Sequence, residues 1–124
     1  MTTKRFREVV RLAEFERDIS RLSRRFPTLE EDLTTLIDVG LFAFHKLGRN
    51  TGVVAIAGLG RTRLPVYKAR KFACQSLKGR GSRSGLRLVY AYDAAEDRVE
   101  LIEIYFKGDQ ENEDRARIAR YYAR

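Results

Sequence analysis

Residues 99–106 read Val-Glu-Leu-Ile-Glu-Ile-Tyr-Phe and are followed by Lys107. Successive side chains of a β-strand point to opposite faces of a sheet. The alternation here predicts a strand with two different faces: Ile102, Ile104 and Phe106 on the apolar one, and Glu103, Tyr105 and Lys107 on the other. Such a strand needs partner strands and an apolar layer to cover it, so the rest of the chain is interpreted around it.

Three more strands and three helices are predicted from the neighbouring sequence. Residues 7–12 form a short first strand, and residues 66–74 and 86–92 form two more. Apolar residues recur at helical spacing from Phe15 to Phe26, and Pro27 ends this first helix. A second helix extends from residue 28 to about residue 48, and Thr28 and Glu31 have the spacing of a capping box. Residues 112–122 form a short closing helix.

The predicted order is therefore β-α-α-β-β-β-α, in a single domain of residues 1–124. Two helices joined by a tight turn pack as an antiparallel hairpin. We expect an α+β fold in which an antiparallel sheet packs against a helical hairpin, with a short C-terminal helix.

The composition excludes several classes of protein. Hydrophobic residues make up 44% of the 124, as in a globular protein, and no run approaches the roughly 20 apolar residues of a membrane helix. Charged residues recur from Lys4 onward, unlike the apolar core of a signal peptide, so we expect a cytoplasmic protein. The single cysteine, Cys74, and the single histidine, His45, are too few for a zinc site and are predicted to be packing residues. We expect no metal and no small-molecule cofactor.

The net charge of +8 is unevenly distributed along the chain. Residues 1–38 hold eight Lys/Arg and eight Asp/Glu, and residues 93–124 hold six and nine. Residues 39–92 hold eleven Lys/Arg and no acid. A solvated surface normally mixes both signs, so this acid-free segment indicates a surface that binds a polyanion.

Several cations of this segment have positions suited to phosphate. Lys68 and Arg70 are two apart on a predicted strand, where two neighbouring cations repel each other unless an anion lies between them. Arg87 stands among apolar residues, an expensive place for a guanidinium without a ligand. The loop of residues 78–85 combines small residues with arginines that can approach phosphates closely. The candidate RNA-binding residues are Lys71, Lys78, Arg80, Arg83 and Tyr67.

Tyrosines are interleaved with these cations. Tyr67, Tyr90 and Tyr92 are predicted strand residues, and a tyrosine can either stack on an unpaired base or pack in the sheet. Tyr105 is the candidate for proton transfer, because Lys107 lies beside it on the same face. A nearby cation favours the phenolate form.

The arrangement of residues 65–107 resembles the toxin subunit of RelE/ParE-type toxin–antitoxin modules. The similarity rests on Tyr-Lys-Ala-Arg at residues 67–70, on Ser-Gly-Leu-Arg-Leu-Val-Tyr at residues 84–90, and on the apolar strand that ends in Lys107. It extends to the order of elements from the helical hairpin to the closing helix. Residues 48–64 and the loop of residues 75–83 are longer than the compact core of that family.

This resemblance implies an mRNA endoribonuclease that acts in the ribosomal A site and is neutralised by a cognate antitoxin protein. In the RelE branch the 2′-hydroxyl attacks its own 3′ phosphate and leaves a cyclic phosphate, without a metal. Lys68 and Arg70 match the cations that activate the nucleophile and hold the phosphate, and Arg87 matches the arginine that stabilises the pentavalent transition state. Lys107 falls near the family's last catalytic cation, and Tyr121 or Tyr122 near the tyrosine of its closing helix.

Two alternatives remain open from the sequence. Relatives that poison gyrase share the fold and keep fewer of these cations, and such a protein needs no catalysis. A non-catalytic RNA-binding module that retains the fold is the second alternative.

Overall fold

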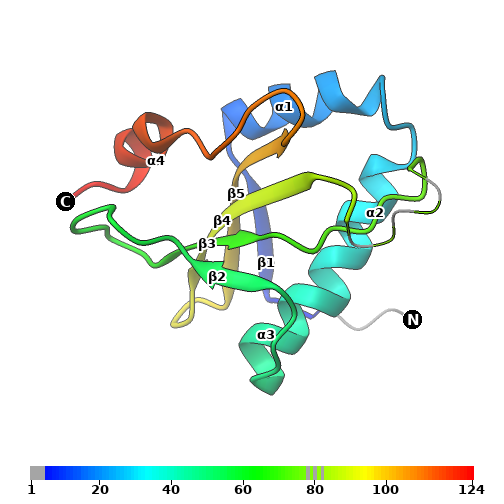
Figure 1. The fold of residues 1–124 in the computed structure, drawn as a ribbon. Coiled ribbons are helices and arrows are strands. Elements are labelled where there is room, and N and C mark those ends of the chain that lie inside the picture. Colours follow the sequence, from blue (N-terminus) through cyan, green and yellow to red (C-terminus); the bar gives the residue numbers. More distant parts are fainter. Residues whose placement is uncertain (1–4, 78, 80, 82) are drawn as a thin grey trace.

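The computed structural model describes residues 5–77, 79, 81 and 83–124. These residues form a five-stranded sheet with the strand order β1-β5-β4-β3-β2. The two longest strands, β4 (Leu86–Asp93) and β5 (Arg98–Phe106), lie side by side in its centre. The shorter strands β1 (Glu8–Arg11), β3 (Val66–Ala69) and β2 (Val53–Ala55) extend the sheet to its two edges (Figure 1).

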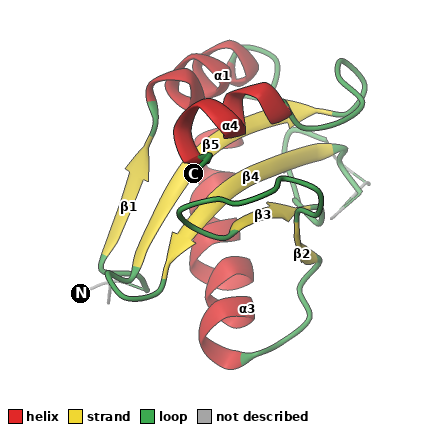
Figure 2. Ribbon diagram, turned by 90° about the vertical axis from the view of Figure 1, so that its left-hand side faces the viewer, coloured by secondary structure: helices red, strands yellow, loops and turns green. Residues whose placement is uncertain are grey.

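Helices cover both faces of the sheet (Figure 2). On one face lie α1 (Ala13–Ser23) and a second, continuous helix composed of α2 (Leu29–Thr35), the π-helical turn η1 (Leu36–Leu41) and α3 (Phe42–Leu47). The short helix α4 (Arg115–Tyr122) lies on the other face. The predicted α+β class and the helical hairpin are confirmed. In the described ranges no helix is long and apolar enough to cross a bilayer.

The sheet differs from the prediction in direction and in size. It is mixed rather than antiparallel, because β1 pairs in parallel with β5, with Glu8 opposite Arg98 and Arg11 opposite Leu101. Alternation along a short strand reports which side is buried but not which way the strand runs. The additional strand β2 is only three residues long and follows a glycine, and β3 ends at Ala69, five residues earlier than predicted.

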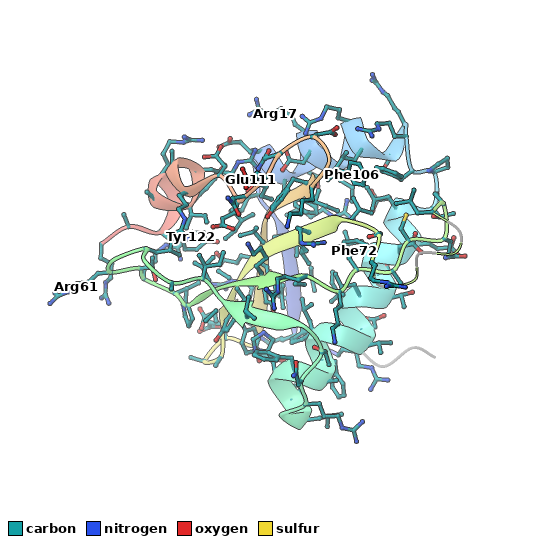
Figure 3. All side chains as sticks on the ribbon, in the orientation of Figure 1. Arg17, Arg61, Phe72, Phe106, Glu111 and Tyr122 are labelled. Atoms are coloured by element: carbon teal, nitrogen blue, oxygen red, sulfur yellow. The ribbon has the colours of Figure 1, made fainter. Side chains whose placement is uncertain are left out.

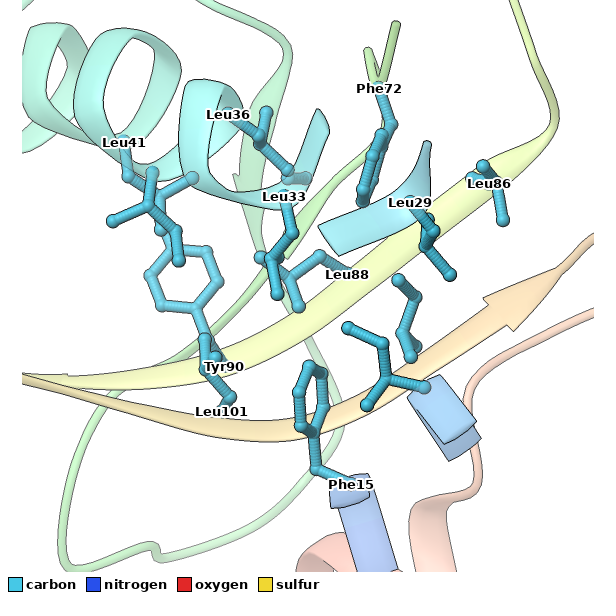
Figure 4. Close-up of a cluster of buried hydrophobic side chains, with 14 of the residues drawn as sticks. Phe15, Leu29, Leu33, Leu36, Leu41, Phe72, Leu86, Leu88, Tyr90 and Leu101 are labelled. Atoms are coloured by element: carbon cyan, nitrogen blue, oxygen red, sulfur yellow. The ribbon is translucent and has the colours of Figure 1, made fainter. Parts of the chain in front are cut away.

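The main core lies between the helical hairpin and the central strands (Figure 4). Leu86, Leu88 and Tyr90 of β4 point toward the hairpin and are fully buried. The hairpin helices meet them with apolar residues spaced along one face: Phe15, Ile19 and Leu22 from α1, and Leu29, Leu33 and Leu41 from the second helix. Burial of this shared apolar surface is the main source of stability for the fold.

A β-bulge interrupts the alternation of β5. Val89 is opposite Glu103 and Tyr90 is opposite Leu101, so Ile102 is an extra residue without a partner in β4. Ile102 therefore packs on the α4 side, with Val89 and Ile118, and its predicted position beside Ile104 is wrong. Ile104 and Phe106 pack toward the helical hairpin, as predicted.

The buried Asp18 and the partly buried Arg117 form hydrogen bonds with the backbone of β5 where its neighbour β1 has ended. The Asp18 carboxylate of α1 accepts the Ile104 backbone N–H at 3.3 Å. Arg117 of α4 donates to Asp18 at 2.6 Å and to the Ile102 carbonyl at 3.0 Å. Buried backbone groups need such partners, so this pair joins α1, α4 and the bulge.

The segment between β2 and β3 holds α4 in place through hydrogen bonds. Arg115 donates to the Ala57 carbonyl at 2.8 Å, and the Arg63 backbone N–H donates to the Tyr122 carbonyl at 2.9 Å. The buried Tyr122 hydroxyl donates to Glu100 at 2.6 Å. Residues beyond the predicted compact core thus hold the closing helix on the sheet.

The predicted capping box is not formed. Thr28 precedes α2 but makes no side-chain cap to the helix. Its hydroxyl donates to Asp32 at 2.7 Å and contacts the Ser76 hydroxyl at 2.7 Å, while Glu31 is exposed. The buried Asp32 carboxylate also accepts the Gln75 backbone N–H at 3.0 Å, so these polar groups anchor the loop after β3.

The two arginines of α4 that pair with α1 provide a test of this anchoring. Arg117→Ala should lower the free energy of unfolding by about 3–5 kcal/mol, because it removes the short ion pair of the buried Asp18 carboxylate and leaves only the exposed Arg21 at 3.9 Å. Arg120→Ala removes an exposed pair with Glu14 and should change stability little. Urea unfolding of both variants measures the difference, and equal losses would contradict a special role of Arg117.

Candidate nucleic-acid interface

The α4 side of the sheet brings together side chains from β3, β4 and β5. Lys68 lies opposite Val89, and Arg87 lies opposite Tyr105. Alternation along β3 places Val66 and Lys68 on this face, because Tyr67 and Ala69 pack toward the helical hairpin. Lys68, Arg87 and Tyr105 therefore occupy neighbouring positions across three adjacent strands.

Lys68 is engaged by a residue that the sequence did not single out. Its ammonium donates to the Glu113 carboxylate at 2.7 Å, and the two side chains are 18% and 4% exposed. Burial raises the pKa of Glu113, but the hydrogen bond from Lys68, a backbone hydrogen bond and the charges of Lys68 and Arg115 together lower the pKa overall. The anion expected between the cations is thus partly supplied by the protein itself.

Arg87 and Arg70 lie further along the same face. Arg87 is half-buried, and one of its guanidinium N–H groups donates to the Leu86 carbonyl at 3.0 Å. Arg70 is exposed one residue beyond the end of β3, and its backbone N–H donates to the Gly52 carbonyl. Continuing the β3–β4 register by one residue beyond Ala69 and Leu88 places Arg70 opposite Arg87. Neither arginine forms an ion pair with a described residue.

Tyr105 is buried, with 3% of its surface exposed. Burial, followed by the charges of Glu113 and Glu103, raises its pKa to about 12, and Arg87 only partly offsets this. The predicted phenolate is therefore wrong, and Tyr105 is a neutral phenol at physiological pH. Lys107 lies beyond the end of β5 and is exposed, and its backbone N–H donates to the Gly85 carbonyl.

Glu103 fixes the chain segment that carries Glu113. This carboxylate is 2% exposed and accepts the Asp114 backbone N–H and the Gln110 side-chain amide, both at 2.8 Å. Burial raises its pKa, opposed by these two hydrogen bonds. The sequence placed Glu103 on the polar face of the strand, but its role as an anchor depends on a segment seven to eleven residues away.

The acid-free segment obtains part of its counter-charge from the end of the chain. Lys46 pairs with Asp97, Arg63 with Glu100 and Lys68 with Glu113. Other cations of the segment form no ion pair within the described part of the chain: Arg49, Arg61, Arg70, Lys71, Arg83 and Arg87. The side chain of Lys71 runs over Gly52, where a Cβ would approach its Cγ to 2.5 Å. Lys78 and Arg80, two predicted RNA-binding residues, lie outside the described residues.

The strand tyrosines pack toward the helical hairpin rather than toward the cations. Tyr67 stacks on Tyr90, with ring centroids 5.5 Å apart, and meets His45 edge-on. Tyr90 is fully buried, and its hydroxyl lies 2.7 Å from Nε2 of His45. Tyr67, a predicted RNA-binding residue, therefore lies on the face of the sheet opposite to Lys68. His45 is a packing residue, as predicted.

The closing helix offers one tyrosine with partial exposure. Tyr122 is fully buried and bonded to Glu100, which raises its pKa further and removes it from any surface site. Tyr121, its neighbour, is half-buried. Figure 3 shows Tyr122, the last residue of α4, and Arg61 on the neighbouring loop.

Comparisons of the chain with protein-family models, with curated proteins and with solved structures find no match.

His45 makes the stability of this fold depend on pH. Burial, with a smaller contribution from Lys46, lowers its pKa from 6.5 to about 4. Between these values the unfolded chain binds a proton that the folded protein does not, so the free energy of unfolding should decrease as the pH falls through this window. In His45→Gln, which keeps a polar partner for Tyr90, urea unfolding should show a flatter dependence over the same range. Identical pH dependence in both proteins would contradict a neutral His45.

Proposed function

We propose that this chain is the toxin of a RelE/ParE-type module and cleaves mRNA in the cytoplasm, on the ribosome, under the control of a cognate antitoxin protein. The observation that carries this proposal is the grouping of Lys68, Arg87 and Tyr105 across β3, β4 and β5, with exposed Arg70 at the end of the row. Cations and a proton donor on one sheet face are the groups that a metal-independent ribonuclease requires.

The arrangement of elements supports the same proposal. A strand, a helical hairpin, an antiparallel group of strands and a closing helix follow one another, as the resemblance implies. The short strand β2 and the loop of residues 56–65 are the additions to that pattern. The hydrogen bonds of the 56–65 loop with α4 give this loop a structural role, because they hold the closing helix.

The chemistry assigned to these residues is an internal transfer at phosphorus. The 2′-oxygen attacks the adjacent phosphorus as its proton passes to water, and the bond from phosphorus to the 5′-oxygen breaks. The products are a 2′,3′-cyclic phosphate and a 5′-hydroxyl, which takes a proton from the exposed ammonium of Lys107. Arg87 and Arg70 donate to the equatorial oxygens, where negative charge accumulates, and Lys68 adds a third cation.

The substrate is held through its phosphates more than through its bases. The described strand tyrosines are buried or face the helical hairpin, so they are not available for base stacking. Exposed cations remain, and they include Arg70, Lys71 and Arg83. Contacts of this kind give affinity that depends on salt and little on sequence.

Arg87→Ala tests the catalytic proposal. Removing a donor to the transition state should reduce cleavage by about 10²–10³-fold. Arg61→Ala, which removes an exposed cation at the tip of the β2–β3 loop, should leave cleavage nearly unchanged. The measurement is growth of a bacterial culture after induction of each chain, with mRNA ends mapped in parallel.

The outcomes separate the alternatives. Growth arrest with new mRNA ends, both lost only in Arg87→Ala, supports the ribonuclease. Growth arrest with intact mRNA would replace it with a protein-directed poison, such as one acting on gyrase. Normal growth with folded wild-type protein would leave a binding relative without catalysis.

Phosphate recognition predicts how binding responds to salt. Arg70→Ala and Lys71→Ala should each weaken binding to unrelated single-stranded RNAs by a similar factor. Each should also reduce the slope of log affinity against log salt concentration by about 0.7. Titrations with two unrelated, 2′-deoxy oligonucleotides measure this without cleavage. Loss of binding to only one of the sequences would indicate base readout instead.

A further inference from the structure

Glu113 is an acidic residue within a basic candidate site. It lies just before α4, and its side chain reaches the sheet face that carries Lys68, Arg87 and Tyr105. A carboxylate next to phosphate-binding cations weakens their attraction for RNA, so its presence needs a compensating benefit. The carboxylate is ionised at neutral pH, since Lys68 lowers its pKa.

We propose that Glu113 is a positioning residue, which holds the Lys68 ammonium beside Arg87 and Tyr105 for cleavage. This inference rests on the proposed function. Lysine has a flexible stem and three donor hydrogens. With one hydrogen donated to Glu113 at 2.7 Å, the ammonium is confined, and two donors remain for a phosphate oxygen.

Glu113 can act in this way because its own position is fixed. Its second carboxylate oxygen accepts from Arg115 at 3.1 Å, and Arg115 also donates to the Ala57 carbonyl at 2.8 Å. The following backbone N–H, that of Asp114, is bound by the buried Glu103. Arg117 then ties α4 to Asp18. Four contacts from four different elements or loops therefore determine where the carboxylate lies.

This fixed geometry favours positioning over inhibition. A carboxylate that imitated a phosphate and blocked the site would have to leave when RNA binds. Glu113 is 4% exposed in its side chain, and the segment that carries it is fastened on both sides by buried contacts. The pair is therefore built to persist while RNA is bound.

The test compares Glu113→Gln with Glu113→Asp and with Glu111→Gln. The amide variant keeps the shape but removes the charge, and the aspartate variant keeps the charge on a shorter stem. Glu111 is an exposed residue of the same loop and provides the matched control (Figure 3). Single-turnover cleavage of RNA at saturating protein, and affinity for a 2′-deoxy oligonucleotide, are measured for each, with thermal melting to verify the fold.

Glu113→Gln should bind the oligonucleotide at least as tightly as the wild type, because one negative charge is removed, yet cleave about 10- to 100-fold more slowly. Glu113→Asp should recover part of that rate, and Glu111→Gln should cleave normally. In a Lys68→Ala background, Glu113→Gln should cause no further loss, since the residue acts through Lys68.

The opposite results overturn the inference. Tighter binding with faster cleavage would make Glu113 an inhibitory anion, and unchanged cleavage would make the pair purely structural. A parallel loss of binding, cleavage and thermal stability in both Glu113 variants would also reject positioning. In all three cases the wild type still cleaves, so the proposed function stands. A wild-type chain that binds RNA without cleaving it would overturn both.

Discussion

The arrangement of this protein depends on how the second half of β5 satisfies its backbone. Its neighbour β1 ends at Arg11, while β5 continues to Phe106 and contains a bulge at Ile102. Asp18 and Arg117 supply the hydrogen bonds that a longer β1 would have supplied. Asp18 belongs to α1 and Arg117 belongs to α4. Their hydrogen bonds with the backbone of β5 therefore hold both helices at the same part of the strand. The loop between β5 and α4 is then directed over the sheet, and Glu113 arrives at Lys68.

The fold determines which of the charged residues lie next to each other. The sequence separates a basic middle segment from an acidic end, and the fold places parts of the two together. Three of the middle segment's cations meet carboxylates of the end: Lys46, Arg63 and Lys68. The remaining cations include Arg70, Lys71 and Arg87, so an excess of positive charge persists where the proposed chemistry takes place. Counting charges along the chain therefore overestimated how many of these cations are free of ion pairs.

The sequence predicted the helices and strands better than it predicted how the strands pair. Hydrophobic periodicity located the helical hairpin, β4 and β5, because each buries one continuous apolar face. It did not predict the parallel direction of β1, which depends on pairing between residues about ninety positions apart. It also missed the bulge at Ile102, because inserting one residue leaves the apolar composition of the strand unchanged.

The candidate site shows the same division. Alternation placed Lys68 and Arg87 on strands, but the face of Tyr67 depends on β3 pairing with a sheet that has a core on both sides. The environment of Tyr105 depends on burial and on Glu113, eight residues further along the chain. No local pattern marks Glu113, since it has the composition of an ordinary solvated loop. The only signal for its role is its position: it is a carboxylate just before a closing helix, in a chain whose β3 strand is basic.

The pairing of β1 with β5 has a consequence for the timing of folding during synthesis. The strand formed by residues 8–11 finds its partner only when residues 98–101 have been made. Contacts of such sequence separation form slowly and late. A nascent chain can form its helical hairpin early, but it cannot complete the sheet until β5 has emerged from the ribosome, or bring Glu113 to Lys68 until the following loop has emerged as well. A chain interrupted before residues 98–101 are made therefore carries the cations of the middle segment without the completed sheet that arranges them.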